Sequence, residues 1–133
     1  MIRLLFCVAL LMATTTFAQV VKPPSGRKIM IFGGEDHRVY LGCLSCSGFV
    51  ADSVLNRYGD HRSKYATNSI FNIYGGYGGK YADGSPCNRY TDHAPVVVDD
   101  VGDYCGKLTI NNNSEQTRSE ALKSWIAGVC QAN

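Results

Sequence analysis

The sequence predicts a small, disulfide-stapled α+β domain, and three observations support this fold class. Two stretches, residues 28–41 and 95–110, each contain a pair of short apolar runs separated by a turn, which is the pattern of a β-hairpin. A section of internal repeats lies between them, and an amphipathic helical pattern follows the second. We therefore expect two antiparallel hairpins around a loop-rich section of 16-residue repeats, with a C-terminal amphipathic helix.

The first 18 residues have the features of a secretory signal peptide. Arg3 supplies a positive charge, residues 4–12 are apolar, and Thr16-Phe17-Ala18 places small residues where signal peptidase cuts. The apolar run is too short to span a bilayer core of about 30 Å, and no second run of this kind follows, so no membrane span is expected. The sequence thus predicts a secreted or periplasmic protein.

Cleavage after Ala18 would leave about 115 of the 133 residues, enough for one small domain. Residues 19–27, which include Pro23-Pro24-Ser25-Gly26, have the composition of an extended leader. A single globular domain is expected over residues 28–133.

The first hairpin is expected from strands at 28–32 and 39–41, with Gly33-Gly34-Glu35-Asp36 breaking the apolar run. The second is expected from strands at 95–98 and 104–110, joined by a turn at 99–103 that contains Gly102. From Ser114 onward the pattern becomes helical, and Asn113 with Gln116 is the expected N-terminal capping pair. The predicted apolar face of this helix consists of Ala121, Leu122, Trp125, Ile126 and Val129.

Residues 53–100 form three blocks of sixteen in which the same residue types recur. The positions in register are Ser53, Ser69 and Ser85, then Asn56, Asn72 and Asn88, then Tyr58, Tyr74 and Tyr90. Since the blocks keep neither a helical nor a strand period for long, we expect each to be a short helical turn with a looped return, the first capped by Asp52. Few aliphatic residues are available here, so Tyr58, Tyr74 and Tyr90 are expected inside.

One register position of the repeat holds His61, Tyr77 and His93, sixteen residues apart. We expect these three side chains at the surface, where they could interact with a ligand together with the repeated asparagines. Flat aromatic faces with amides beside them are typical of binding sites for glycans and peptides. The predicted binding surface therefore consists of Tyr77, His61, His93, Asn56, Asn72 and Asn88.

Three segments carry a resemblance to a known group of proteins. They are Tyr40-Leu41-Gly42-Cys43-Leu44-Ser45-Cys46, the Tyr-Gly and Lys-Tyr blocks, and Pro95-Val96-Val97-Val98 followed by Tyr104 and Gly106-Lys107-Leu108-Thr109. On these segments, residues 29–111 resemble uncharacterised exported bacterial proteins with tandem Tyr-Gly-x-Tyr-Gly-x-Lys-Tyr repeats. The first block departs from that pattern, with Asp60-His61-Arg62 where the second has Gly76-Tyr77-Gly78, and the helix with Cys130 lies outside it. The resemblance implies no activity.

The chain after residue 18 contains five cysteines: Cys43, Cys46, Cys87, Cys105 and Cys130. In a small exported domain such usage indicates structural disulfides. One arrangement joins Cys46 to Cys87 and Cys105 to Cys130, although spacing alone does not fix the pairing. Because five is odd, the remaining cysteine is a free thiol, links two chains into a dimer, or serves another role.

Two enzymatic alternatives stay open. Cys43-x-x-Cys46 has the spacing of thiol–disulfide proteins, although residues 47–52 do not predict the helix that activates such a thiol. Thiolates at this spacing also suit a structural zinc ion. A metal-dependent hydrolase is the other alternative, since each histidine follows an aspartate in Asp36-His37, Asp60-His61 and Asp92-His93. The alternation of histidine with tyrosine in the repeat argues against it.

Composition excludes further classes of function. Without Arg3, 12 basic residues stand against 11 acidic ones, a net charge of about +1 with the two signs interspersed. Nucleic-acid binding needs a concentrated basic face and is not expected. No nucleophile elbow, phosphate loop or zinc-protease helix occurs, and no cofactor or metal is predicted. The sequence favours a non-enzymatic binding or structural module that presents its repeats to a glycan or an extracytoplasmic protein.

Overall fold

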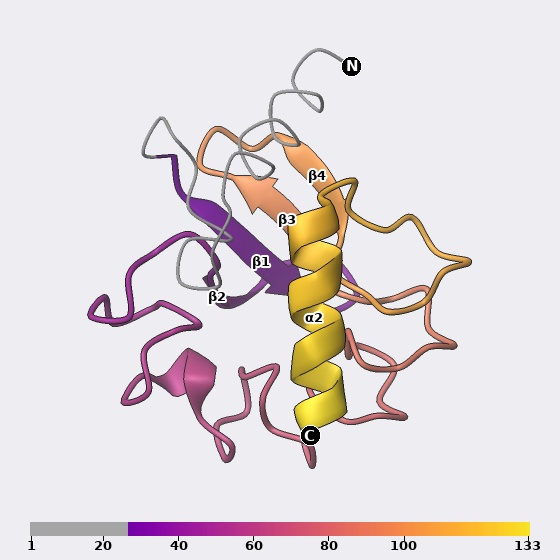
Figure 1. The fold of residues 1–133 in the computed structure, drawn as a ribbon, viewed down its shortest axis with the longest axis horizontal. Helices are drawn as coiled ribbons and strands as arrows, with labels where there is room; N and C mark the ends of the chain where they lie inside the picture. Colours follow the sequence, from indigo (N-terminus) through magenta and orange to yellow (C-terminus); the bar gives the residue numbers. More distant parts are fainter. Residues whose placement is uncertain (1–26) are drawn as a thin grey trace.

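The computed structural model describes residues 27–133, which form a small α+β domain (Figure 1). Its antiparallel sheet has the strand order β2-β1-β3-β4. The strands are β1 (Ile29–Gly33), β2 (Val39–Cys43), β3 (Val96–Asp99) and β4 (Tyr104–Lys107), and α2 (Glu120–Ala132) follows them. The predicted signal peptide and the first part of the predicted leader lie outside the described residues. Within residues 27–133, no helix is long and apolar enough to cross a membrane.

Both predicted hairpins are present, and β1 joins them into one sheet. β1 pairs with β2 on one side and with β3 on the other, where the register runs from Ile29 opposite Asp99 to Phe32 opposite Val96. This central position explains why Ile29 and Ile31 are fully buried. The predicted turn of the second hairpin is confirmed, because Gly102 has φ +87° and its amide donates to the carbonyl of Asp99 at 3.1 Å.

Two strand glycines allow other chain segments to approach the sheet closely. Gly42 has φ +127° beside the bulge in the β1–β2 pairing, and a Cβ there would lie 2.8 Å from Val54. Gly106 has φ +92°, and a Cβ there would lie 2.6 Å from the Cα of Thr117. A side chain at either position would meet both backbone strain and a clash.

The core is shared by the sheet, the repeats and α2. Its fully or nearly fully buried aliphatic members are Ile29, Ile31, Leu41 and Val97 from the sheet, Leu44, Val54, Ile70 and Leu108 from the loops, and Leu122 and Ile126 from the helix. In Figure 1 the helix crosses the sheet, and the looped repeats run from beside β2 to the C-terminal end of α2. The repeats are therefore packed into the domain rather than attached to its outside.

The helix begins later than its sequence pattern indicates. Ser119 is the N-cap, and its hydroxyl accepts a hydrogen bond from the Leu122 amide at 3.2 Å, so the predicted Asn113–Gln116 cap is wrong. The preceding segment lies along β4 instead. There the Thr117 amide donates to the Lys107 carbonyl at 2.8 Å, which keeps this segment extended.

Within residues 27–133, disulfides join Cys43 to Cys46 and Cys87 to Cys130, so the suggested Cys46–Cys87 and Cys105–Cys130 pairing is wrong. The first closes the turn directly after β2, and the second ties the third repeat to the last turns of α2. The sulfur of Cys46 is bonded to Cys43 and so cannot also form a disulfide with Cys87. None of the cysteines in the described range is a free thiol.

The repeats contain little regular structure: a 3-10 turn, η2 (Asp60–Arg62), is the only helical element within residues 53–95. The helical turn expected over residues 53–56 is not formed, and Asp52 does not cap it. The Asp52 carboxylate instead accepts hydrogen bonds from Lys28 Nζ, at 2.7 Å, and from the Tyr40 hydroxyl. Asp52 therefore links the start of the repeats to the first hairpin.

Candidate functional site

Each repeat is held by the same side-chain hydrogen bonds to its own backbone. The serine hydroxyl accepts from the amide two residues later at 3.0–3.1 Å, and the asparagine Oδ1 accepts from the tyrosine amide two residues after it at 3.0–3.1 Å. The asparagine Nδ2 also donates to the carbonyl six residues earlier. Serine and asparagine form such turns readily, which is why these two residue types recur at this spacing.

These bonds determine which side chains point inward. The residue after each serine is buried, as Val54 and Ile70 are, whereas Tyr58, Tyr74 and Tyr90 are 80–98% exposed. The prediction that these three tyrosines lie inside is therefore wrong. The bond from each tyrosine amide to asparagine Oδ1 turns the chain away from the core immediately after the asparagine. Other apolar residues, such as Val54, Ile70 and Phe71, fill the interior instead.

A second row of exposed aromatic residues has the same period. Phe49, Tyr65 and Tyr81 are sixteen residues apart and are also 80–98% exposed. Ser47 accepts from the Phe49 amide and Ser63 from the Tyr65 amide, which repeats the local turn. Phe49 precedes Ser53, the first residue of the predicted repeats, and was therefore not predicted, although the spacing of 49, 65 and 81 indicates it.

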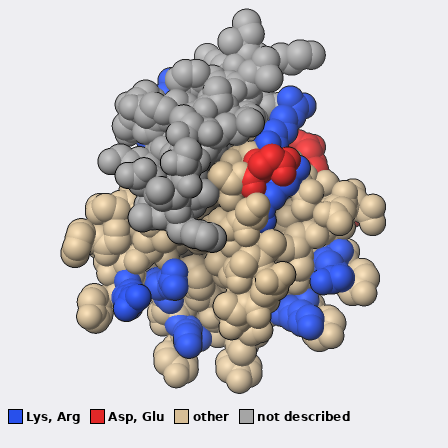
Figure 2. All heavy atoms as spheres, in the orientation of Figure 1, with Lys and Arg blue, Asp and Glu red and all other residues tan. Residues whose placement is uncertain are grey.

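We call the six exposed side chains the aromatic face: Phe49, Tyr58, Tyr65, Tyr74, Tyr81 and Tyr90. Four of them directly follow an exposed basic residue, in Arg57-Tyr58, Lys64-Tyr65, Lys80-Tyr81 and Arg89-Tyr90. In the view of Figure 2, Lys and Arg are spread over the lower part of the molecule with no Asp or Glu among them, and the acidic residues visible lie above. An exposed positive charge is therefore adjacent in sequence to four of the six rings.

A hollow of about 250 Å³ lies within this region. Lys80 with Tyr81 and Arg89 with Tyr90 line it around Cys87. It adjoins a larger hollow of about 560 Å³, which shares Lys80, Cys87 and Arg89 and continues to the C-terminal end of α2. The Cys87–Cys130 disulfide thus fixes the third repeat against the helix beside the hollow that Lys80, Tyr81, Arg89 and Tyr90 line.

The asparagines predicted to lie on the binding surface instead hold the backbone of the repeats through hydrogen bonds. Asn72 and Asn88 are buried and Asn56 is half-buried, and both ends of each amide are bonded to the backbone. An amide used in this way is not available to a ligand unless the turn opens. The asparagines therefore position the tyrosines that follow them.

The residues at the third register position do not lie together. The half-buried His61 packs edge-on against Tyr40, with ring centroids 5.2 Å apart, and its Nδ1 lies 3.0 Å from the Asn68 carbonyl oxygen. Tyr77 packs over the end of β1, where a Cβ on Gly33 would lie 2.9 Å from its ring. His93 is exposed. The structure brings Tyr77 and His93 to one hollow and leaves His61 elsewhere.

That hollow, of about 570 Å³, also contains Asp83 and Glu35. His93 Nδ1 lies 2.7 Å from Asp83 Oδ2, so its partner is Asp83 and not the adjacent Asp92. Hydrogen bonds from Thr91 and then from His93 hold the pKa of Asp83 below its ordinary value of 3.8. An imidazole held by a carboxylate can accept a proton, but here the two side chains are 69% and 75% exposed, so water surrounds them.

The metal-hydrolase alternative requires ligands that converge. Within residues 27–133, no group of three or more His, Cys, Asp or Glu side chains lies in an arrangement that could hold a metal ion. His61 packs against Tyr40, whereas His93 lies beside Asp83, so these two histidines do not converge. The hydrolase alternative stays a prediction without a supporting cluster in this part of the chain.

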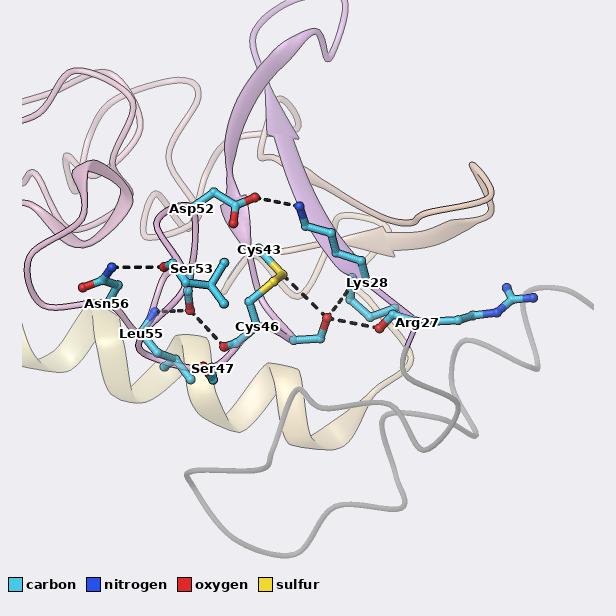
Figure 3. Close-up of a disulfide and its surroundings, with 12 residues drawn as sticks. Arg27, Lys28, Cys43, Cys46, Ser47, Asp52, Ser53, Leu55 and Asn56 are labelled. Carbon is cyan, nitrogen blue, oxygen red and sulfur yellow. Dashed lines mark hydrogen bonds and ion pairs between the residues drawn. A yellow bond between two sulfur atoms is a disulfide. The ribbon is translucent and has the colours of Figure 1, made fainter.

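The Cys43–Cys46 pair lies between β2 and the first repeat (Figure 3). Cys43 is fully buried, its amide donates to the Asp52 carbonyl at 2.8 Å, and its carbonyl accepts from the Val54 amide at 3.1 Å. Residues 44–53 form turns and no helix begins there. The helix N-terminus that lowers the thiol pKa in thiol–disulfide enzymes is therefore missing from this segment. Thiol–disulfide activity stays a prediction that the local structure does not favour.

Comparison with known proteins adds no assignment, because no protein-family model, no curated protein and no solved structure matches the chain. The resemblance to exported repeat proteins likewise stays a prediction.

Proposed function

We propose that the protein is an exported, non-enzymatic glycan-binding module and that the aromatic face holds the ligand. The observation that carries this proposal is the exposure of six aromatic side chains in two rows with one 16-residue period, none of them less than 80% exposed. Rings placed in water contribute little to the stability of the fold, and large exposed apolar patches mark interaction sites.

A sugar polymer matches the chemistry and the spacing of this face. The face of a tyrosine ring carries partial negative charge and attracts the C–H groups on the flat side of a sugar ring. Tyrosine has few torsions to restrict, so little conformational entropy is lost on binding. A periodic row of rings suits a ligand that is itself periodic. Disulfides such as Cys43–Cys46 and Cys87–Cys130 are consistent with an extracytoplasmic location, where such polymers are found.

A protein partner is the less suitable ligand. Protein interfaces concentrate their aromatic residues in a well-packed centre with charges at the rim. Here an exposed basic residue is the neighbour of four of the six rings, as Lys80 and Arg89 are of Tyr81 and Tyr90. We therefore propose a glycan rather than a protein.

The proposal is tested by titrating soluble polysaccharides against the protein with both disulfides formed, using affinity electrophoresis and calorimetry. Replacing Tyr58, Tyr74 and Tyr90 together by alanine should weaken binding by about tenfold or more. The same change should alter the unfolding free energy by no more than about 0.5 kcal/mol per residue, because exposed side chains contribute little packing. Tyr104→Ala on β4, outside the aromatic face, is the control and should bind as the wild type does. Unchanged binding in the triple variant would overturn the proposal.

A further inference from the structure

Five basic side chains of the repeats have no acidic partner among the described residues: Arg57, Arg62, Lys64, Lys80 and Arg89. Most of the basic side chains near the sheet and helix differ in this respect. Arg27, Lys28, Arg38 and Lys123 each lie 2.7–3.5 Å from a carboxylate oxygen. Lys107, whose Nζ donates to the Asp92 carbonyl at 2.6 Å, and the exposed Arg118 also lie without a carboxylate partner. Basic side chains without an acidic partner are therefore concentrated in the repeats, among the residues described.

Arg57 and Arg62 illustrate this arrangement. The Arg62 guanidinium lies 4.3 Å from the centroid of the Phe71 ring, which holds it over an apolar surface. Burial, and then the charge of nearby Arg57, lower the pKa of Arg62. Two like charges kept close together without a carboxylate attract an anion from solution.

The hollow between the second and third repeats provides a place where such an anion can bind. Lys80 and Arg89 line it, Tyr81 and Tyr90 stand beside them, and its lining contains no Asp or Glu. Its volume of about 250 Å³ is below that of pockets for drug-sized ligands, about 300–1,000 Å³, and therefore suits a small group such as one sugar residue. Arginine binds carboxylate and sulfate through two parallel hydrogen bonds, and lysine adds a compact charge.

We propose that the ligand is an acidic glycan, a polymer of sugars that carry carboxylate or sulfate groups. One acidic group lies between Lys80 and Arg89, and its sugar ring packs against Tyr81 or Tyr90. The Arg57-Tyr58 and Lys64-Tyr65 pairs bind neighbouring sugars of the same polymer. This inference rests on the proposed glycan-binding function and identifies its substrate class.

Charge density favours a glycan over the other polyanions. Double-stranded DNA carries one charge per roughly 1.7 Å and is bound by dense basic surfaces. The cations here are spread over three repeats, and Asp60 and Asp92 lie exposed among them. A polymer with about one charge per sugar can place its anions at the cations and avoid the carboxylates. An anionic membrane presents a continuous negative surface and would meet the same two aspartates.

The test uses two pairs of probes that differ only in charge. Polygalacturonate is compared with its fully methyl-esterified form, and dextran sulfate with dextran. We expect the protein to bind at least one acidic probe about tenfold more tightly than its uncharged counterpart, with affinity that falls as salt rises. The first pair reports on carboxylate and the second on sulfate. Poly-dT and phosphatidylglycerol vesicles are titrated in parallel.

Matched charge variants test whether the preference for acidic probes comes from the hollow. Lys80→Gln with Arg89→Gln should lower affinity for the acidic probe about tenfold and leave the uncharged probe unaffected. Arg38→Gln with Arg118→Gln removes two exposed basic residues outside the repeats and should change neither. Equal binding of charged and uncharged probes would leave the proposed function intact and overturn this inference. Binding of only poly-dT or only vesicles would overturn both, and so would the absence of binding to all four glycans.

Discussion

The two halves of the molecule satisfy their backbones in different ways. In the sheet-and-helix half, backbone groups bond to one another, as β1 does to both β2 and β3. In the repeat half, serine and asparagine side chains take the place of a neighbouring strand, with hydrogen bonds of 3.0–3.1 Å in each block. The first arrangement buries mainly large aliphatic side chains, whereas the second buries serines and asparagines beside a few apolar residues such as Val54 and Ile70.

This difference explains what each half leaves exposed. Ser53, Ser69 and Ser85 are fully buried, while the tyrosines that follow them are among the most exposed residues described. Because the interior of the repeats is filled by serines, asparagines and one or two apolar residues per block, the large side chains are free to face solvent. Stability should therefore depend on the asparagines and disulfides, and binding on the rings and cations.

The Cys87–Cys130 disulfide joins the two halves, and its removal should have the largest effect. Replacing both cysteines by alanine opens a loop with a sequence separation of 43 and should lower the free energy of unfolding by about 4 kcal/mol in the chain-entropy estimate. Replacing Cys43 and Cys46 opens a loop with a separation of 3 and should cost about 2 kcal/mol. Urea unfolding followed by tyrosine and tryptophan fluorescence measures both.

The comparison between the two disulfides serves as the control. If removing the long-range disulfide costs no more than removing the local one, the repeats hold their place against the helix without it. The two halves would then be joined mainly by the shared core, through residues such as Ile70 and Leu122.

The strands could be predicted from sequence because their signals are local. Apolar runs rich in valine and isoleucine, broken by Gly33-Gly34 and by Gly102, place the four strands within one to three residues of their observed ends. The β1–β3 pairing depends on segments more than sixty residues apart, as Ile31 and Val97 are. No local pattern specifies such a pairing. The sequence therefore predicted the two hairpins but not the β1–β3 pairing that joins them into one sheet.

In the repeats, the sequence predicted the period of the residues but not the direction of their side chains. The period of the repeat was readable, and it identified the region that carries the aromatic face. Burial of Tyr58, Tyr74 and Tyr90 was inferred from their size, yet the hydrogen bond from each tyrosine amide to asparagine Oδ1 determines their direction. Side-chain hydrophobicity and local turn geometry conflict here, and the turn geometry decides the outcome.

Asn72→Ala should destabilise the repeat half by about 1–3 kcal/mol, because it leaves two backbone groups without partners in a largely buried site. The amide donates to the Ala66 carbonyl and accepts from the Tyr74 amide, both at 3.1 Å. Asn112→Ala changes an exposed asparagine outside the repeats and should stay within about 0.5 kcal/mol of wild type. Equal urea midpoints for the two variants would show that the asparagine bonds do not hold the repeats.

Asp52 links the first hairpin to the repeats and should give the smallest effect, one that depends on pH. Hydrogen bonds from Lys28 and then Tyr40 lower the pKa of Asp52 below its ordinary value of 3.8. Its ionised form therefore stabilises the fold above about pH 4, and this contribution is lost as the pH falls through the lowered pKa. Asp52→Asn should reduce the unfolding free energy by about 0.5–1 kcal/mol at pH 7, since the pair is partly exposed. Urea titrations from pH 7 down to about pH 2.5 should show the variant and wild type converging at the acid end. A constant difference across that range would mean that Asp52 acts through its shape rather than its charge.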